Sequence, residues 1–142
     1  MKYSKINKVW FEDGRIYVLT EDAIVKSQPL EAFPTLKDAS DSQRLDFYIW
    51  DNRQSIRWDS IDEDIHISNF DQPEHVNYNN DVNKLLSSFP WLNLAEFANL
   101  IGISKSRLDR YRYGIVSPGN QTMAKIKSGL QKIAHDISMA IM

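Results

Sequence analysis

The stretch LAEFANLIGISKSRLDRYRYG, residues 94–114, predicts two short helices joined by a sharp turn. Ala98 lies where the first helix must approach the second closely, so a small side chain is needed there. Gly102 lies in the turn, where a positive φ would strain any residue that has a Cβ atom. Ser104 precedes the second helix and is a good N-cap. Large apolar residues then supply a core that both helices share, namely Phe97, Ile101, Ile103, Leu108 and Tyr111.

The second predicted helix carries a surplus of positive charge. Lys105 and Arg107 lie in its first turn, where a cation opposes the helix dipole at a cost of about 0.3–1 kcal/mol. Arg110 and Arg112 follow, and Asp109 is the acid among these four cations. If Leu108 and Tyr111 point inward, the side chains that point at least partly outward are Lys105, Ser106, Asp109, Arg110 and Arg112. An exposed cationic helix is the geometry that enters the major groove of DNA.

The order of these residues resembles the helix-turn-helix of the phage lambda repressor family. Gly114, Pro118 and the run TMAKI at residues 122–126 also resemble the segment after the second helix in that family, and the resemblance covers residues 81–137. It implies an all-α domain that binds double-stranded DNA. Carried over position by position, it implies base-reading roles for Lys105, Ser106 and Arg110, and phosphate contacts from Asn93, Ser104, Arg107 and Arg112.

Asp109 departs from this interpretation, because a carboxylate repels phosphate. The departure is removed if Asp109 accepts a hydrogen bond from a cytosine amino group, or if it pairs with Arg112 or Lys105. The alternative for the whole stretch is a solvated face of a helical bundle that has no ligand.

The charge of the chain is divided unevenly between its halves. The 142 residues carry a net charge of −2, but residues 1–80 hold nine Lys and Arg against fifteen Asp and Glu, whereas residues 81–142 hold eight against four. An acidic half followed by a basic half predicts two domains with different partners, of which the basic one suits a polyanion.

The first half has the pattern of short strands separated by turns. β-rich runs at residues 9–11, 16–19, 23–25, 47–50, 56–58 and 65–67 alternate with turn signals such as Asp13-Gly14, and residues 33–39 predict a short helix. We therefore expect a small antiparallel sheet with a short helix over residues 1–70, and a polar linker at residues 71–80. From residue 81 the apolar period becomes about 3.6, which predicts a helical domain over residues 81–142 and an α+β chain overall.

Three segments of the first half resemble a small bacterial family of unknown function, DUF2442. They are FEDG at residues 11–14, FPTLKDAS at residues 33–40 and IRWDSIDEDI at residues 56–65, within a resemblance that spans residues 5–70. The resemblance implies a compact α+β domain that is sometimes fused to a repressor-type helix-turn-helix. It implies no catalytic residue.

Four carboxylates, Asp59, Asp62, Glu63 and Asp64, lie between two predicted strands. Clustered carboxylates can hold Mg²⁺ or Ca²⁺, but the EF-hand spacing is missing and His66 alternates with isoleucines as a strand residue does. A solvated turn or an acidic partner surface is the alternative. We expect neither a metal nor a cofactor nor an enzyme activity. Most of the strand aromatics are expected to pack in the core, and the alternative is an exposed subset that forms a site for a small molecule or a protein.

The sequence thus predicts a sequence-specific DNA-binding transcriptional regulator, a repressor, that acts as a homodimer. The first domain would mediate dimerisation or bind a protein partner. The alternative is an antitoxin-like protein-interaction module of a toxin–antitoxin pair. The chain shows neither an apolar run of spanning length nor an h-region near its start, so a cytoplasmic protein is expected.

Overall fold

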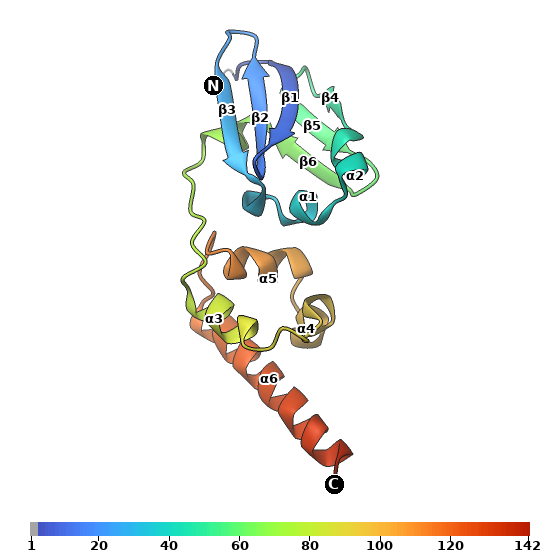
Figure 1. Ribbon diagram of the computed structural model, residues 1–142. Coiled ribbons are helices and arrows are strands. Elements are labelled where there is room, and N and C mark those ends of the chain that lie inside the picture. The colour runs from blue at the N-terminus through green and yellow to red at the C-terminus, as the bar shows by residue number, and fades with distance from the viewer. Residues whose placement is uncertain (1–2) are drawn as a thin grey trace. The chain divides into compact units, whose positions relative to one another are not determined.

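The computed structural model describes residues 3–142, which form two compact units that divide between Val76 and Asn77 (Figure 1). Strands and short helices make up the first unit, and four α-helices make up the second. No helix in the described part of the chain combines the length and the apolar character that crossing a lipid bilayer requires.

The first unit begins with an antiparallel sheet of three strands, β1 (Ile6–Glu12), β2 (Arg15–Thr20) and β3 (Val25–Pro29), in the order β1-β2-β3. Asp13 and Gly14 connect the first two strands with φ angles of 51° and 72°, the left-handed pair that a tight hairpin turn requires. β1 and β2 are therefore direct neighbours, as the Asp-Gly signal predicts, and β3 pairs with the other edge of β2.

A second antiparallel sheet follows in the same unit. It contains β4 (Tyr48–Trp50), β5 (Ser55–Trp58) and β6 (Glu63–His66), in the order β4-β5-β6. The 3₁₀ helix η1 (Leu30–Ala32) and the helices α1 (Pro34–Asp38) and α2 (Asp41–Leu45) connect the two sheets, and the 3₁₀ helix η2 (Ile67–Asp71) follows β6.

The expected layout of one small sheet with one short helix is therefore wrong. Both sheets bury one face in a common core, to which Ile16 and Val18 contribute from the first sheet and Ile56, Trp58 and Ile65 from the second. Alternation of apolar and polar residues reports which face of a strand is buried, but it does not report which strands pair. A capping box, Ser40 with Gln43, marks the start of the second α-helix and was a readable signal.

The second unit contains α3 (Asp81–Ser87), α4 (Leu94–Ile101), α5 (Lys105–Arg112) and α6 (Asn120–Ala140). Side-chain oxygens of Asn80, Asn93 and Ser104 cap the first three of these helices by accepting a hydrogen bond from a backbone N–H of the first turn. The apolar faces meet in one core with the following buried members: Val82, Leu86, Phe97, Ala98, Ile101, Leu108, Tyr111 and Ile126.

Two glycines end α4 and α5 in the same way. Gly102 and Gly114 have φ angles of 79° and 77°. After α4, the N–H groups of Gly102 and Ile103 donate to the carbonyls of Asn99 and Ala98, and the N–H groups at 114 and 115 repeat this pattern after α5. This is the Schellman motif, in which a left-handed residue lets the chain turn back while satisfying the last carbonyls of the helix. The motif therefore fixes the direction that the chain takes after each helix.

Gly129 lies where α6 meets α4. A Cβ atom at this position would lie 2.5 Å from Cγ2 of Ile101 and 3.0 Å from Cε1 of Phe97. We expect Gly129→Ala to lower the free energy of unfolding by about 1 kcal/mol, because an overpacking cost of about 1–3 kcal/mol exceeds the gain in helix propensity of about 1 kcal/mol. Urea denaturation followed by far-UV circular dichroism measures the change.

Ser128→Ala is the matched control, because Ser128 is exposed on the same helix. Its higher helix propensity should make that variant slightly more stable than the natural chain. Equal stabilisation by both substitutions would show that the contact between α4 and α6 is looser than described.

Candidate nucleic-acid interface

The helices α4 and α5 are joined by three residues, Gly102 to Ser104, and share one core. The residues that the sequence assigned to this motif lie in or against that core, except for the glycine, which forms the turn. Five are buried, Phe97, Ala98, Ile101, Leu108 and Tyr111, whereas Ile103 is half-buried and packs against them. With its inner face held by Leu108 and Tyr111, α5 has a defined outer face.

Asp109 is the principal correction to the sequence interpretation of α5. It was expected to point at least partly outward, but its side chain is 0% exposed. Lys105 Nζ lies 2.6 Å from its Oδ2 atom, and Arg112 Nη1 lies 2.5 Å from its Oδ1 atom. The pairing of Asp109 with Lys105 or Arg112, one of the alternatives that the sequence left open, is therefore confirmed, at the spacings i,i+4 and i,i+3. The carboxylate is thus neutralised inside the protein.

This pairing holds two of the predicted DNA contacts in place. Lys105, predicted to read bases, and Arg112, predicted to contact phosphate, are both half-buried and both donate to Asp109. The guanidinium of Arg112 also lies 5.4 Å from the ring centroid of Tyr113, a cation–π distance. Each side chain therefore has a defined position before any ligand binds.

Arg107, another predicted phosphate contact, is exposed and also anchored. Its Nε atom donates to the hydroxyl of Tyr111 over 2.7 Å, and its guanidinium carbon lies 5.8 Å from the centre of that ring. The anchor uses one of the five N–H donors of the guanidinium, so the others remain for a ligand.

Arg110 differs from the other cations of α5. Within residues 3–142 its guanidinium makes no hydrogen bond and no ion pair, and it is partly exposed. Ser106, the third predicted base-reading residue, is also partly exposed. A guanidinium without an internal partner keeps its full donor fork for a ligand, and this fork matches the two acceptors of a guanine edge.

The remaining predicted phosphate contacts are the N-cap residues. Asn93 Oδ1 accepts from the N–H of Glu96, and Ser104 Oγ accepts from the N–H of Arg107. Both are exposed at helix N-termini, where backbone N–H groups and the helix dipole favour an anion. Their amide and hydroxyl hydrogens can donate while the oxygens cap, so the capping role and the predicted contact are compatible.

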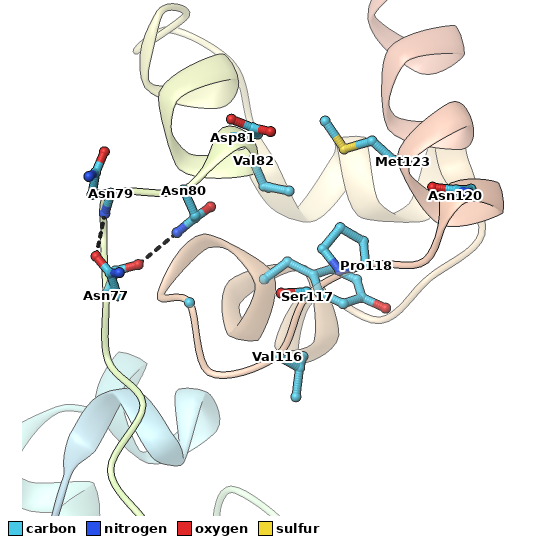
Figure 2. A pocket seen from close by; sticks show the side chains of 12 residues that line it. Asn77, Asn79, Asn80, Asp81, Val82, Val116, Ser117, Pro118, Asn120 and Met123 are labelled. Atoms are coloured by element: carbon cyan, nitrogen blue, oxygen red, sulfur yellow. Dashed lines mark hydrogen bonds between the residues drawn. The ribbon is translucent and has the colours of Figure 1, made fainter.

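A polar cavity of about 580 Å³ lies beside this motif, between the N-terminal ends of α3 and α6 (Figure 2). Its amide side chains have internal roles. Asn80 donates to the carbonyls of Asn77 and Arg112, and the N–H of Asn79 donates to Oδ1 of Asn77. These bonds attach the segment before α3 to the end of α5. We therefore interpret the amide side chains of the cavity as structural, and we assign no ligand to it.

The acidic turn of the first unit is organised by one arginine. Arg57 donates to Asp62 over 2.7 Å and to Asp59 over 3.0 Å, and these two hydrogen bonds raise the pKa of the guanidinium. Burial raises the pKa of Glu63. No group of three carboxylates or histidines in the described part of the chain is placed to hold a metal ion.

Two aromatic side chains flank this turn. Tyr48 and Trp50 are exposed on β4, where the hydroxyl of Tyr48 donates to Asp59 and Nε1 of Trp50 donates to Asp64. Burial and the charge of Asp59 raise the pKa of Tyr48. The turn therefore presents carboxylates and aromatic rings together, a surface that suits a cationic partner.

Residues 6–72 match a family described as protein of unknown function (DUF2442), which confirms the resemblance expected for residues 5–70. No curated protein matches the chain. Among solved structures, the chain is similar to a crystal structure from Nitrosomonas europaea ATCC 19718 that is described as a "putative DNA binding protein". The two share 14% identity over 87% of this chain and 84% of that chain, with a TM-score of 0.35. The family match covers the first unit and does not extend to the helical unit.

Proposed function

We propose that the chain is a sequence-specific DNA-binding transcriptional regulator, a repressor, in which α4 and α5 act as a helix-turn-helix. In this proposal the outer face of α5 enters the major groove. Lys105, Ser106 and Arg110 read base edges, and the phosphate contacts come from Asn93, Ser104, Arg107 and Arg112. The first unit binds a protein partner through its acidic surface.

The observation that carries the proposal is the state of the five charged side chains on α5. Asp109, the acid, is buried and paired, so it does not face a phosphate. Three cations, Lys105, Arg107 and Arg112, are held by internal hydrogen bonds. Arg110 keeps its donors. Cations that already hold their positions lose less conformational entropy on binding, which is the advantage of preorganisation.

Selection of bound duplexes from a random pool, using the full chain, tests this function. We expect a recurrent motif, and fluorescence anisotropy with that motif should show an affinity that falls steeply as salt rises. Absence of binding to any duplex at low salt would contradict the proposal. Co-purification of a stoichiometric protein partner by such a non-binding chain would instead support the antitoxin-like interaction module.

Arg110→Ala should weaken binding to the selected motif by about 5- to 150-fold, the range expected for one bidentate base contact, and should leave binding to unrelated duplexes nearly unchanged. Arg110→Lys keeps the charge but loses the planar fork, so it should also lose discrimination while keeping the salt dependence of the natural chain. Anisotropy titrations with both duplexes provide the measurement.

Lys127→Ala is the matched control, because Lys127 is exposed on α6 and its loss removes the same charge. It should affect both duplexes slightly and equally. If Arg110→Ala behaves like this control, α5 does not read bases through Arg110.

A further inference from the structure

One apolar stripe runs along α6 and is covered only over its first half. Met123, Ile126, Leu130 and Ile133 pack against the core of the second unit. The same stripe continues at spacings of three and four through Ala134, Ile137 and Ile141. There it is bare, since Ile137 is 47% and Ile141 81% exposed. Figure 1 shows this part of α6 running past the other helices of the second unit.

An apolar groove lies at the base of the projecting segment. Its volume is about 410 Å³. Leu92, Phe97, Leu100 and Ile133 form its apolar lining, and Asn93, Glu96 and Asn99 complete its rim. Leu100 is 45% exposed, although it is a large apolar residue on α4. Ile133 belongs to the groove and lies one helical turn before Ile137. The exposed isoleucines and the groove are therefore neighbours along α6.

We propose that a second copy of this chain covers this surface, with the two α6 helices antiparallel about a two-fold axis near Ile137. A two-fold interface needs a surface that is complementary to itself. With the axis at Ile137, Ile141 of the second copy lies opposite Ile133, and Met142 of that copy reaches the groove beside Leu100. The two-fold rotation fills the groove of each copy in the same way. This inference rests on the proposed function for its purpose, which is to present two α5 helices to one duplex.

The available area agrees with this occupant. Leu100, Ile137, Ile141 and Met142 are 45%, 47%, 81% and 94% exposed, which amounts to on the order of 500 Å² per copy. A standard interface buries about 800 Å² per partner and is about 65% apolar in homodimers, so a comparable apolar area is required.

The flanking charges also permit the pairing. In this register His135 and Met139 lie on the far side of α6 from the axis, and Asp136 lies beside the apolar stripe. Lys132 is paired with Asp136 within its own helix over 3.1 Å. The charge of Asp136 is therefore offset within each copy.

Sedimentation of the full chain without DNA tests the proposal. We expect a dimer at micromolar concentration, and we expect Ile137→Asp to raise its dissociation constant at least 100-fold, because two carboxylates would meet on the axis out of water. Ser138→Asp adds the same charge to an exposed position beside the stripe and should have little effect. Neither substitution should lower the thermal unfolding midpoint of the monomeric chain, because neither residue belongs to the core.

The lack of cysteines in the natural sequence permits a second test. A residue on a two-fold axis meets its own copy, so Ile137→Cys should form an interchain disulfide under mild oxidation, within the Cα separation of about 4.4–6.8 Å that a disulfide needs. Met139→Cys, on the opposite side of α6, should stay largely uncrosslinked.

A natural chain that stays monomeric, or stronger crosslinking through Met139→Cys than through Ile137→Cys, would overturn the proposed dimer. A dimer that binds no duplex would overturn the proposed DNA binding and leave this interface standing. Sedimentation and anisotropy thus separate the two failures.

Discussion

Asp109→Ala is expected to lower the free energy of unfolding of the helical unit by about 3 kcal/mol. Removing one member of a buried ion pair costs about 3–5 kcal/mol, because the remaining charge stays buried without compensation. The lower end applies here, since the side chains of Lys105 and Arg112 are 34% and 22% exposed and can reach water. Urea denaturation of the full chain, followed by far-UV circular dichroism, measures the loss.

Asp136→Ala provides the control for this prediction. Asp136 forms the same kind of i,i+4 pair with a lysine, Lys132, but both side chains are more than half exposed. Exposed helix pairs contribute about 0.3–0.5 kcal/mol, so this variant should unfold nearly as the natural chain does. Similar losses in the two variants would contradict the described burial of Asp109.

Gly114→Ala is the second substitution with a large expected effect, about 3 kcal/mol on the same unit. Gly114 has a φ of 77°, and a Cβ atom there would lie 2.2 Å from the carbonyl oxygen of Asn77. The left-handed conformation costs alanine about 1–2 kcal/mol. The backbone at Asn77 must also move, which endangers its hydrogen bonds with Tyr113 and Asn80, worth about 1 kcal/mol each.

Gly102→Ala separates the cost of the left-handed backbone conformation from the cost of a steric clash. Gly102 has a φ of 79°, but a Cβ atom there meets no atom within 4 Å. This variant should therefore lose only about 1–2 kcal/mol from the conformational cost. Far-UV circular dichroism reports both unfolding transitions, because most of the α-helical residues of the chain lie in the helical unit. If the two variants lose equal stability, the segment at Asn77 is not held against the end of α5.

The contrast between these glycines shows where sequence patterns lose information. Gly102 was recognised as the glycine of the turn, because its position between two periodic segments requires a left-handed residue. Gly114 has the same backbone conformation, but its close approach to Asn77 involves residues almost forty positions apart. Distances of this kind depend on how the helices pack.

The same distinction applies to charge on α5. Its cationic character and N-cap were apparent in the order of residues, because capping and helix spacing act over three or four positions. The burial of Asp109 was not, since the apolar pattern alone placed it on the outer face. Burial depends on the neighbouring helices. Only the packed unit therefore shows which cations of α5 form hydrogen bonds within the protein and that Arg110 forms none.

In the first unit, the local pattern located five of the six described strands and the Asp13-Gly14 hairpin, because alternation and turn chemistry are properties of a few consecutive residues. The prediction of a strand at residues 23–25 was wrong, because Ala23 lies in a turn and β3 begins at Val25. Pairing was decided by tertiary structure. Ile16 and Ile56 have the same apolar signature but belong to different sheets that share a core. Hydrogen bonding between strands and the covering of an apolar face depend on contacts distant in the chain. For the same reason the apolar stripe of α6 is visible in the sequence, but only the fold shows that its last turns are exposed.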